Sequence, residues 1–72
     1  MLSLSEINIV VNGDTHRCLE NQSIPSILQS LGFNIRLIAL EYNGEILHRQ
    51  YWDHTIIREG DRLEVVTIVG GG

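Results

Sequence analysis

Residues 60–72 read GDRLEVVTIVGGG, which is a turn, a β-branched segment and three glycines. The segment from 62 to 69 alternates in the way that a strand with two different faces does. Leu63 and Val65 share one of these faces. We expect that face to pack against the core of the protein.

Val66 and Ile68 fall on the opposite face of the same predicted strand, just before the glycines. Ordinary β-propensity near a chain end is one explanation for two apolar residues there. The functional interpretation is an exposed apolar patch that brings a partner enzyme to the glycines. The sequence therefore predicts a partner-docking patch at Val66 and Ile68.

Gly70, Gly71 and Gly72 follow the strand directly. Because glycine has no Cβ, such a segment is slim and adopts backbone angles that other residues avoid. We predict that it threads into a narrow partner site. There Gly70 and Gly71 avoid the collisions that side chains would cause, and Gly72 presents its carboxylate. The alternative is a frayed terminus without a function.

The rest of the chain predicts one small α+β domain. Two Asn-Gly pairs, at 12–13 and 43–44, predict tight hairpin turns between short strands. Between the hairpins, Ser23 is a good N-cap, apolar residues recur at helical spacing, and Gly32 is a suitable C-cap, so we expect one helix over about 24–31. A single helix of this kind can cover one face of a mixed sheet.

Composition and charge exclude several classes of function. The chain has 72 residues, of which 43% are hydrophobic, and a net charge of −4. An acidic chain lacks the basic face that nucleic acid needs, and no apolar run reaches the roughly 20 residues that span a bilayer. A single cysteine, Cys18, forms no internal disulfide, so we expect a reducing, cytoplasmic compartment.

Other reactive residue types have ordinary structural explanations. We expect Cys18 to be a small core residue, and the pair Glu59 and Asp61 to be structural or solvated beside a turn. Tyr51 and Trp52 are expected to seal an edge of the core. The histidines lack the spacing of metal ligands, and Asp53 with His54 lacks a nucleophile, so we predict no metal site and no catalytic residue in this chain. The three histidines are His16, His48 and His54.

Three segments together resemble the ThiS family, the sulfur-carrier proteins of thiamine biosynthesis. They are LEYNGEI (40–46), RQYW (49–52) and the ending GDRLEVVTIVGGG, within a resemblance that covers residues 7 to 72. The resemblance implies a ubiquitin-like β-grasp fold over one domain, 1–72, with a flexible tail at 70–72. His48 stands where many members carry proline, a departure that touches no chemistry.

The resemblance also implies a function. A partner similar to ubiquitin-activating enzymes would use ATP and Mg²⁺ to adenylate the Gly72 carboxylate, and sulfur from a cysteine desulfurase route would displace AMP. The resulting thiocarboxylate would donate its sulfur to thiazole synthase. The chain would then be a protein co-substrate that binds no cofactor itself, not an enzyme. Two alternatives stay open, a ubiquitin-like covalent modifier and a carrier like the small subunit of molybdopterin synthase, although the absence of proline from residues 66–69 favours the thiamine branch.

Overall fold

The computed structural model describes residues 4–68 of the chain. Its elements follow the order that the sequence predicts, a hairpin, one helix, a second hairpin and a last strand, together with two short 3₁₀ helices. The elements are β1 (Glu6–Val11), β2 (Asp14–Leu19), α1 (Ile24–Ser30), η1 (Ile35–Leu37), β3 (Ile38–Tyr42), β4 (Glu45–Ile46), η2 (Arg49–His54) and β5 (Arg62–Thr67). The predicted α+β architecture is confirmed.

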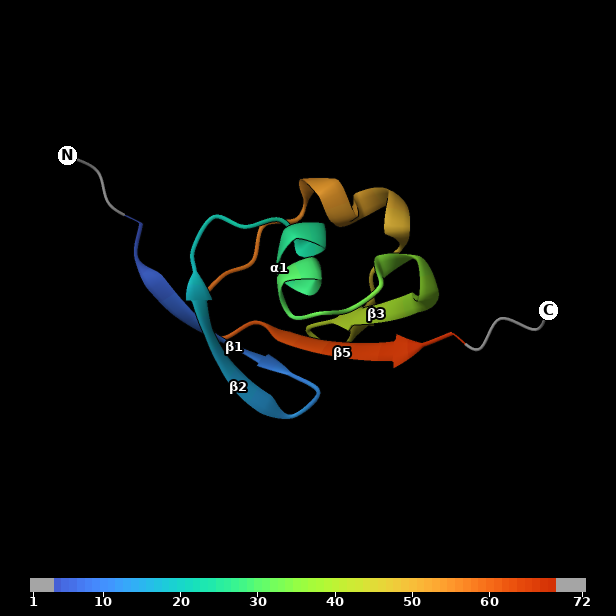
Figure 1. The fold of residues 1–72 in the computed structure, drawn as a ribbon, viewed down its shortest axis with the longest axis horizontal. Helices are drawn as coiled ribbons and strands as arrows, with labels where there is room; N and C mark the ends of the chain where they lie inside the picture. Colours follow the sequence, from blue (N-terminus) through green and yellow to red (C-terminus); the bar gives the residue numbers. More distant parts are fainter. Residues whose placement is uncertain (1–3, 69–72) are drawn as a thin grey trace.

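The five strands form one mixed sheet in the order β2-β1-β5-β3-β4. The last strand in sequence therefore lies in the middle, parallel to β1 and antiparallel to β3. Figure 1 shows α1 and η2 together on one side of this sheet, with β5 running beneath α1. One face of the sheet is covered, and the other face is open.

Two hairpin turns and one helix form where local chemistry predicts them. Asn12 and Asn43 both adopt positive φ angles of 50° and 52°, and each is followed by a glycine at positive φ, as tight hairpin turns require. Ser23 caps α1 by accepting a hydrogen bond from the Ser26 amide, at 3.4 Å. Gly32, at φ +90°, follows the helix in the left-handed conformation.

The core lies between the covered face of the sheet and α1. Alternate residues of β1, β3 and β5 supply the sheet side, and one stripe of α1 supplies the other. The core residues are Ile7, Ile9, Val11, Ile24, Ile27, Leu28, Ile38, Leu40, Trp52, Ile57, Leu63 and Val65. The prediction that Leu63 and Val65 face the core is confirmed.

One expectation near the core needs correction. Trp52 is buried, as predicted, but its neighbour Tyr51 is half exposed and does not seal the core. In a 3₁₀ helix, successive side chains point about 120° apart, so only one of the two can face inward. Just before β1, the Ser5 carbonyl oxygen accepts a hydrogen bond from the Glu20 amide at 2.9 Å, which extends the β1–β2 pairing by one residue.

Candidate functional site

The open face of the sheet carries a patch of exposed apolar side chains beside the end of β5. The side chain of Val66 is 56% exposed, that of Ile68 49% and that of Ile46 71%. The exposed Ala39 lies directly opposite Val66 in the β3–β5 ladder. We call these four residues, Ala39, Ile46, Val66 and Ile68, the apolar patch.

The surface of the apolar patch is hollowed. One depression of about 220 Å³ is lined by Ala39, Ile46 and Val66, with Glu41 at its side. A second, of about 180 Å³, lies toward η2 and brings Ile68 beside Ile46 and Arg49. Shallow apolar hollows of this size accept side chains from a partner protein better than they enclose a small molecule.

Backbone hydrogen bonding sets where the chain leaves the sheet. The Ile68 amide donates to the Leu37 carbonyl oxygen at 2.6 Å, so the chain stays attached to η1 one residue beyond β5. Residues 69–72 follow from this point. Gly70, Gly71 and Gly72, the predicted reacting tail, lie outside the described residues.

Arg49 holds η1 against the rest of the domain. Its guanidinium donates to the carbonyl oxygens of Ile35 and Ile38, the latter at 3.1 Å, and stacks over the Trp52 ring. The Trp52 indole N–H in turn donates to the Leu47 carbonyl oxygen at 2.8 Å. These contacts connect the buried Trp52 to the segment that binds Ile68.

A buried carboxylate fixes the other end of β5. The side chain of Asp61 is 7% exposed and accepts hydrogen bonds from the Tyr42 hydroxyl, from Asn43 Nδ2 at 3.1 Å and from the Arg58 amide at 2.8 Å. Burial, and then the hydrogen bond to Asp61, raise the pKa of Tyr42 to about 12. Three donors satisfy the carboxylate, which makes Asp61 a structural residue of the turn, as expected.

A single side chain also ties the first hairpin to β5. Asn12 Oδ1 accepts a hydrogen bond from the Val65 amide at 2.7 Å, and the Asn12 amide donates to the Leu63 carbonyl oxygen at 2.9 Å. Parallel pairing of β1 with β5 ends at Val11 and Leu63, so Asn12 continues the hydrogen bonding where the ladder stops. The middle of β5 is therefore held from both sides.

Cys18 lies on β2 and packs half-buried against the core, in agreement with the expected structural role. Burial, followed by the negative charge of Glu59, raises the pKa of its thiol. Because the thiolate is the reactive form, this environment disfavours nucleophilic chemistry at neutral pH. The cysteine packs against the core.

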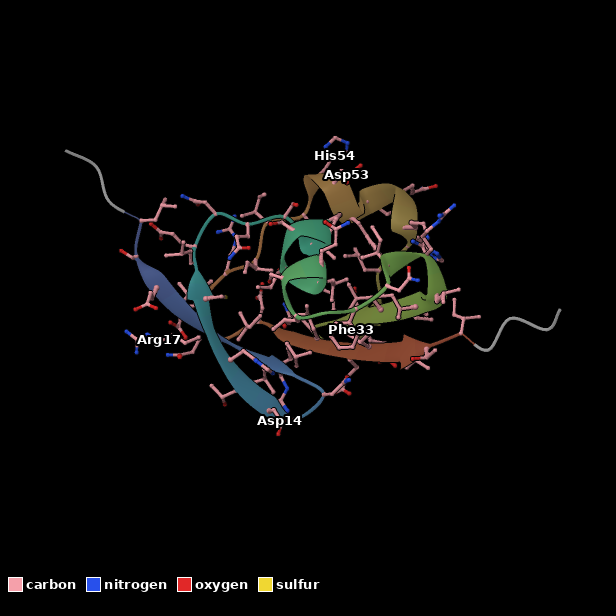
Figure 2. The ribbon with its side chains drawn as sticks, in the orientation of Figure 1. Asp14, Arg17, Phe33, Asp53 and His54 are labelled. Carbon is pink, nitrogen blue, oxygen red and sulfur yellow. The ribbon has the colours of Figure 1, made fainter. Side chains whose placement is uncertain are left out.

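The remaining reactive residues are dispersed. His16 lies on β2, His48 precedes η2, and Asp53 and His54 sit on the outer side of η2, pointing away from the sheet (Figure 2). Within residues 4–68, no three His, Cys, Asp or Glu side chains cluster in a way that would hold a metal ion. Over the same residues, no helix is long and apolar enough to span a membrane.

The sequence profile of the ThiS family matches residues 5–72. The chain belongs to the ThiS family. A crystal structure of the ThiS-family thiamine biosynthesis protein from Geobacter metallireducens superposes with a TM-score of 0.79 at 30% identity, covering 92% of this chain and 100% of the other. The ubiquitin-like β-grasp fold expected from the sequence is thus confirmed.

Three further relatives show how this ThiS domain occurs elsewhere. An uncharacterised protein, ycf40 of Porphyra purpurea, is 39% identical over 92% of this chain and 93% of its own length. The sulfur carrier protein ThiS of Escherichia coli is 26% identical over 92% of this chain and all of its own. A thiazole synthase of Paramagnetospirillum magneticum is 30% identical over 92% of this chain, but the matched part is only 20% of that enzyme.

Sequence reasoning found half of the apolar patch. It named Val66 and Ile68 from the alternation of the last strand, whereas Ala39 and Ile46 were missed. The same alternation in residues 38–42 places Ala39 on the open face, so that signal was available. Ile46 was harder to find because β4 has two residues, too few to show a period.

Proposed function

We propose that this ThiS-family chain is a sulfur carrier in thiamine biosynthesis and that the Gly72 carboxyl group carries the sulfur. Membership of the family over residues 5–72, a range that includes the glycines, is the observation that carries the proposal. The chain would act as a protein co-substrate. ATP and Mg²⁺ would be bound by its adenylating partner.

The chemistry begins with an ionised carboxylate, because a terminal carboxyl group has a pKa of about 3.5. The Gly72 carboxylate attacks the α-phosphorus of ATP, giving an acyl-adenylate and pyrophosphate. A persulfide from a cysteine desulfurase route then attacks the acyl carbon and AMP leaves. A thiol cleaves the resulting sulfur–sulfur bond, which releases the thiocarboxylate and a disulfide.

The folded domain contributes positioning to this chemistry. The Ile68 amide is bonded to η1, four residues before Gly72, and η1 is held by Arg49. Extended chain covers at most about 3.5 Å per residue, so Gly72 stays within roughly 14 Å of Ile68. A partner that reacts with Gly72 would therefore contact the apolar patch, which supports the docking role proposed for Val66 and Ile68.

Thiazole synthase is the acceptor that we propose for the sulfur. The thiazole synthase of Paramagnetospirillum magneticum contains a stretch that is similar to 92% of this chain and makes up 20% of the enzyme. A second thiazole synthase, from Magnetococcus marinus, does the same at 30% identity. Fusion of two domains in one chain raises their effective concentration, which favours partners that act in succession.

Intact-protein mass spectrometry tests the proposal. The chain is incubated with ATP, Mg²⁺, a ubiquitin-activating-enzyme-like adenylyltransferase and a persulfide source. We expect a mass gain equal to the exchange of one oxygen for sulfur, lost when Gly72 is deleted and retained in an Asp53→Asn control on η2. Retention of the gain after deletion of Gly72 would contradict the assignment, and isopeptide conjugates through Gly72 would point to a covalent modifier instead.

A further inference from the structure

Two carboxylates lie directly opposite each other on the open face of the sheet. Glu41 of β3 and Glu64 of β5 are Cα partners in the antiparallel ladder, and both side chains are exposed. The alternation of β5 puts Glu64 on the same face as Val66, and Glu41 is also the ladder partner of Ile46. We call Glu41 and Glu64 the acidic pair, and it borders the apolar patch.

Within residues 4–68, neither member of the acidic pair forms a salt bridge. Between residues 4 and 68, the one salt bridge joins Arg17 and Glu6, at 3.1 Å, on the β1–β2 side of the sheet. Like charges directly opposite in a ladder destabilise the sheet. The native fold therefore keeps an unfavourable pair of charges at the border of its apolar patch, where a bound cation from outside would relieve the repulsion.

The same charges exclude some occupants of this face. A second copy of the chain would bring its own acidic pair toward this one, and each copy carries a net charge of −4. Nucleic acid would add further negative charge. A partner protein that covers the apolar patch and is attracted by the acidic pair therefore has an apolar surface with a basic group beside it.

The position of the apolar patch indicates at which reaction step a partner protein binds it. Because Gly72 stays within roughly 14 Å of Ile68, an enzyme that activates Gly72 covers this face, since each side of a typical protein interface buries about 800 Å². Activation is the first step that the proposed function requires. The adenylating enzyme is thus the partner to which this surface is matched.

We infer that the adenylating enzyme presents an apolar surface to the patch of Ala39, Ile46, Val66 and Ile68, and places an arginine or lysine between Glu41 and Glu64. This inference rests on the proposed function and adds the chemistry of the partner's surface. An arginine suits the position best, because its planar fork can donate to both carboxylates at once. Opposite charges across the two surfaces also accelerate the encounter.

The test measures ATP–pyrophosphate exchange by the adenylyltransferase against the concentration of the carrier. Replacing both residues, Glu41→Gln with Glu64→Gln, should raise the half-saturating concentration about tenfold with the maximal rate unchanged. The control is Glu45→Gln, which removes one negative charge from β4, where Glu45 pairs with Tyr42 on the other face. The control should leave half-saturation unchanged.

Thermal unfolding of the same variants supplies a readout that does not depend on the enzyme. Both the double glutamine variant and Glu64→Lys should raise Tm, because each removes the like-charge repulsion. Glu64→Lys should nevertheless impair half-saturation more than Glu64→Gln does, since it repels the partner's basic group. Stability and recognition then change in opposite directions, which a merely structural role of the acidic pair does not produce.

The outcomes separate the two proposals. Unchanged half-saturation in the double variant, or an equal change in Glu45→Gln, overturns the inference while an active wild-type chain leaves the proposed function intact. A wild-type chain that supports no exchange overturns the proposed function and this inference with it.

Discussion

The guanidinium of Arg49 lies 4.6 Å from the centre of the Trp52 ring and donates a hydrogen bond of 3.1 Å to the Ile38 carbonyl oxygen. One face of the group thus stacks on a buried aromatic ring, while its edge donates to the carbonyl oxygens of Ile35 in η1 and of Ile38 at the start of β3. The position of η1, and with it the backbone oxygen that binds Ile68, depends on this side chain.

Arg49→Lys should therefore loosen the end of β5. Lysine keeps the positive charge but has no planar fork that bonds two carbonyl oxygens and stacks on Trp52 at the same time. We expect a loss of about 1–2 kcal/mol in the free energy of unfolding, measured in urea. Hydrogen exchange at the Ile68 amide should accelerate relative to the Val10 amide, which bonds to Asp61.

The control for this substitution is Arg36→Lys, because Arg36 is an exposed arginine on η1. It should leave both the stability and the exchange at Ile68 close to wild type. An Arg49→Lys protein with wild-type exchange at Ile68 would show that η1 is held without the arginine.

Ile68→Glu should weaken binding to the adenylating partner and leave the domain folded. Ile68 is 49% exposed and outside the core cluster, so a charge there changes the free energy of unfolding by about 0.5 kcal/mol or less. Titration calorimetry measures the binding, and urea unfolding measures the stability.

Leu63→Ala provides the contrast for Ile68→Glu. Leu63 is fully buried in the same segment of chain, and truncating it should cost about 2–5 kcal/mol. If Ile68→Glu destabilised the domain as much as Leu63→Ala does, the patch would be part of the core.

Tyr42→Phe should remove a pH-dependent part of the stability. The folded-state pKa of Tyr42 is raised to about 12 from an ordinary value of 10.0, so the protonated hydroxyl favours the folded state. This contribution is fully present below pH 10 and is lost as pH rises through 12. Urea unfolding of both proteins across that window should show the wild type converging on Tyr42→Phe.

The same substitution has an expected effect at neutral pH. Asp61 loses one of its three hydrogen-bond donors, so Tyr42→Phe should cost about 1 kcal/mol there. A constant difference between wild type and Tyr42→Phe from neutral pH to pH 12 would mean that the hydroxyl does not titrate as described.

Cys18→Ala should load sulfur on Gly72 as well as the wild type does. The raised pKa of the Cys18 thiol keeps it in the unreactive protonated form near neutral pH. Intact-mass measurement of the loaded chains makes the comparison, and alkylation of wild-type Cys18 should be slower than that of a free thiol. Loss of loading in Cys18→Ala, with the fold retained, would assign the thiol a part in the transfer.

Local chemistry in the sequence determined many of the elements. The Asn-Gly pairs require positive φ angles, Ser23 and Gly32 mark the limits of α1, and the alternation in residues 62–68 separates core from open face. These features depend on neighbours in the chain, so they can be read without knowledge of the fold. For that reason the element order, the core face of β5 and the exposure of Val66 and Ile68 were predicted correctly.

Long-range pairing was decided only by the tertiary structure. No local pattern connects the residues that meet in the parallel contact of β1 with β5 or in the hydrogen bond from the Val65 amide to Asn12. The same holds for the hydrogen bond from Arg49 of η2 to the Ile38 carbonyl oxygen, next to η1. The opposition of Glu41 and Glu64 depends on strand register, and a shift of one residue would move one of them to the other face. The sequence by itself thus determined the elements and the faces of the last strand, whereas packing decided which residues from distant strands meet on the open face.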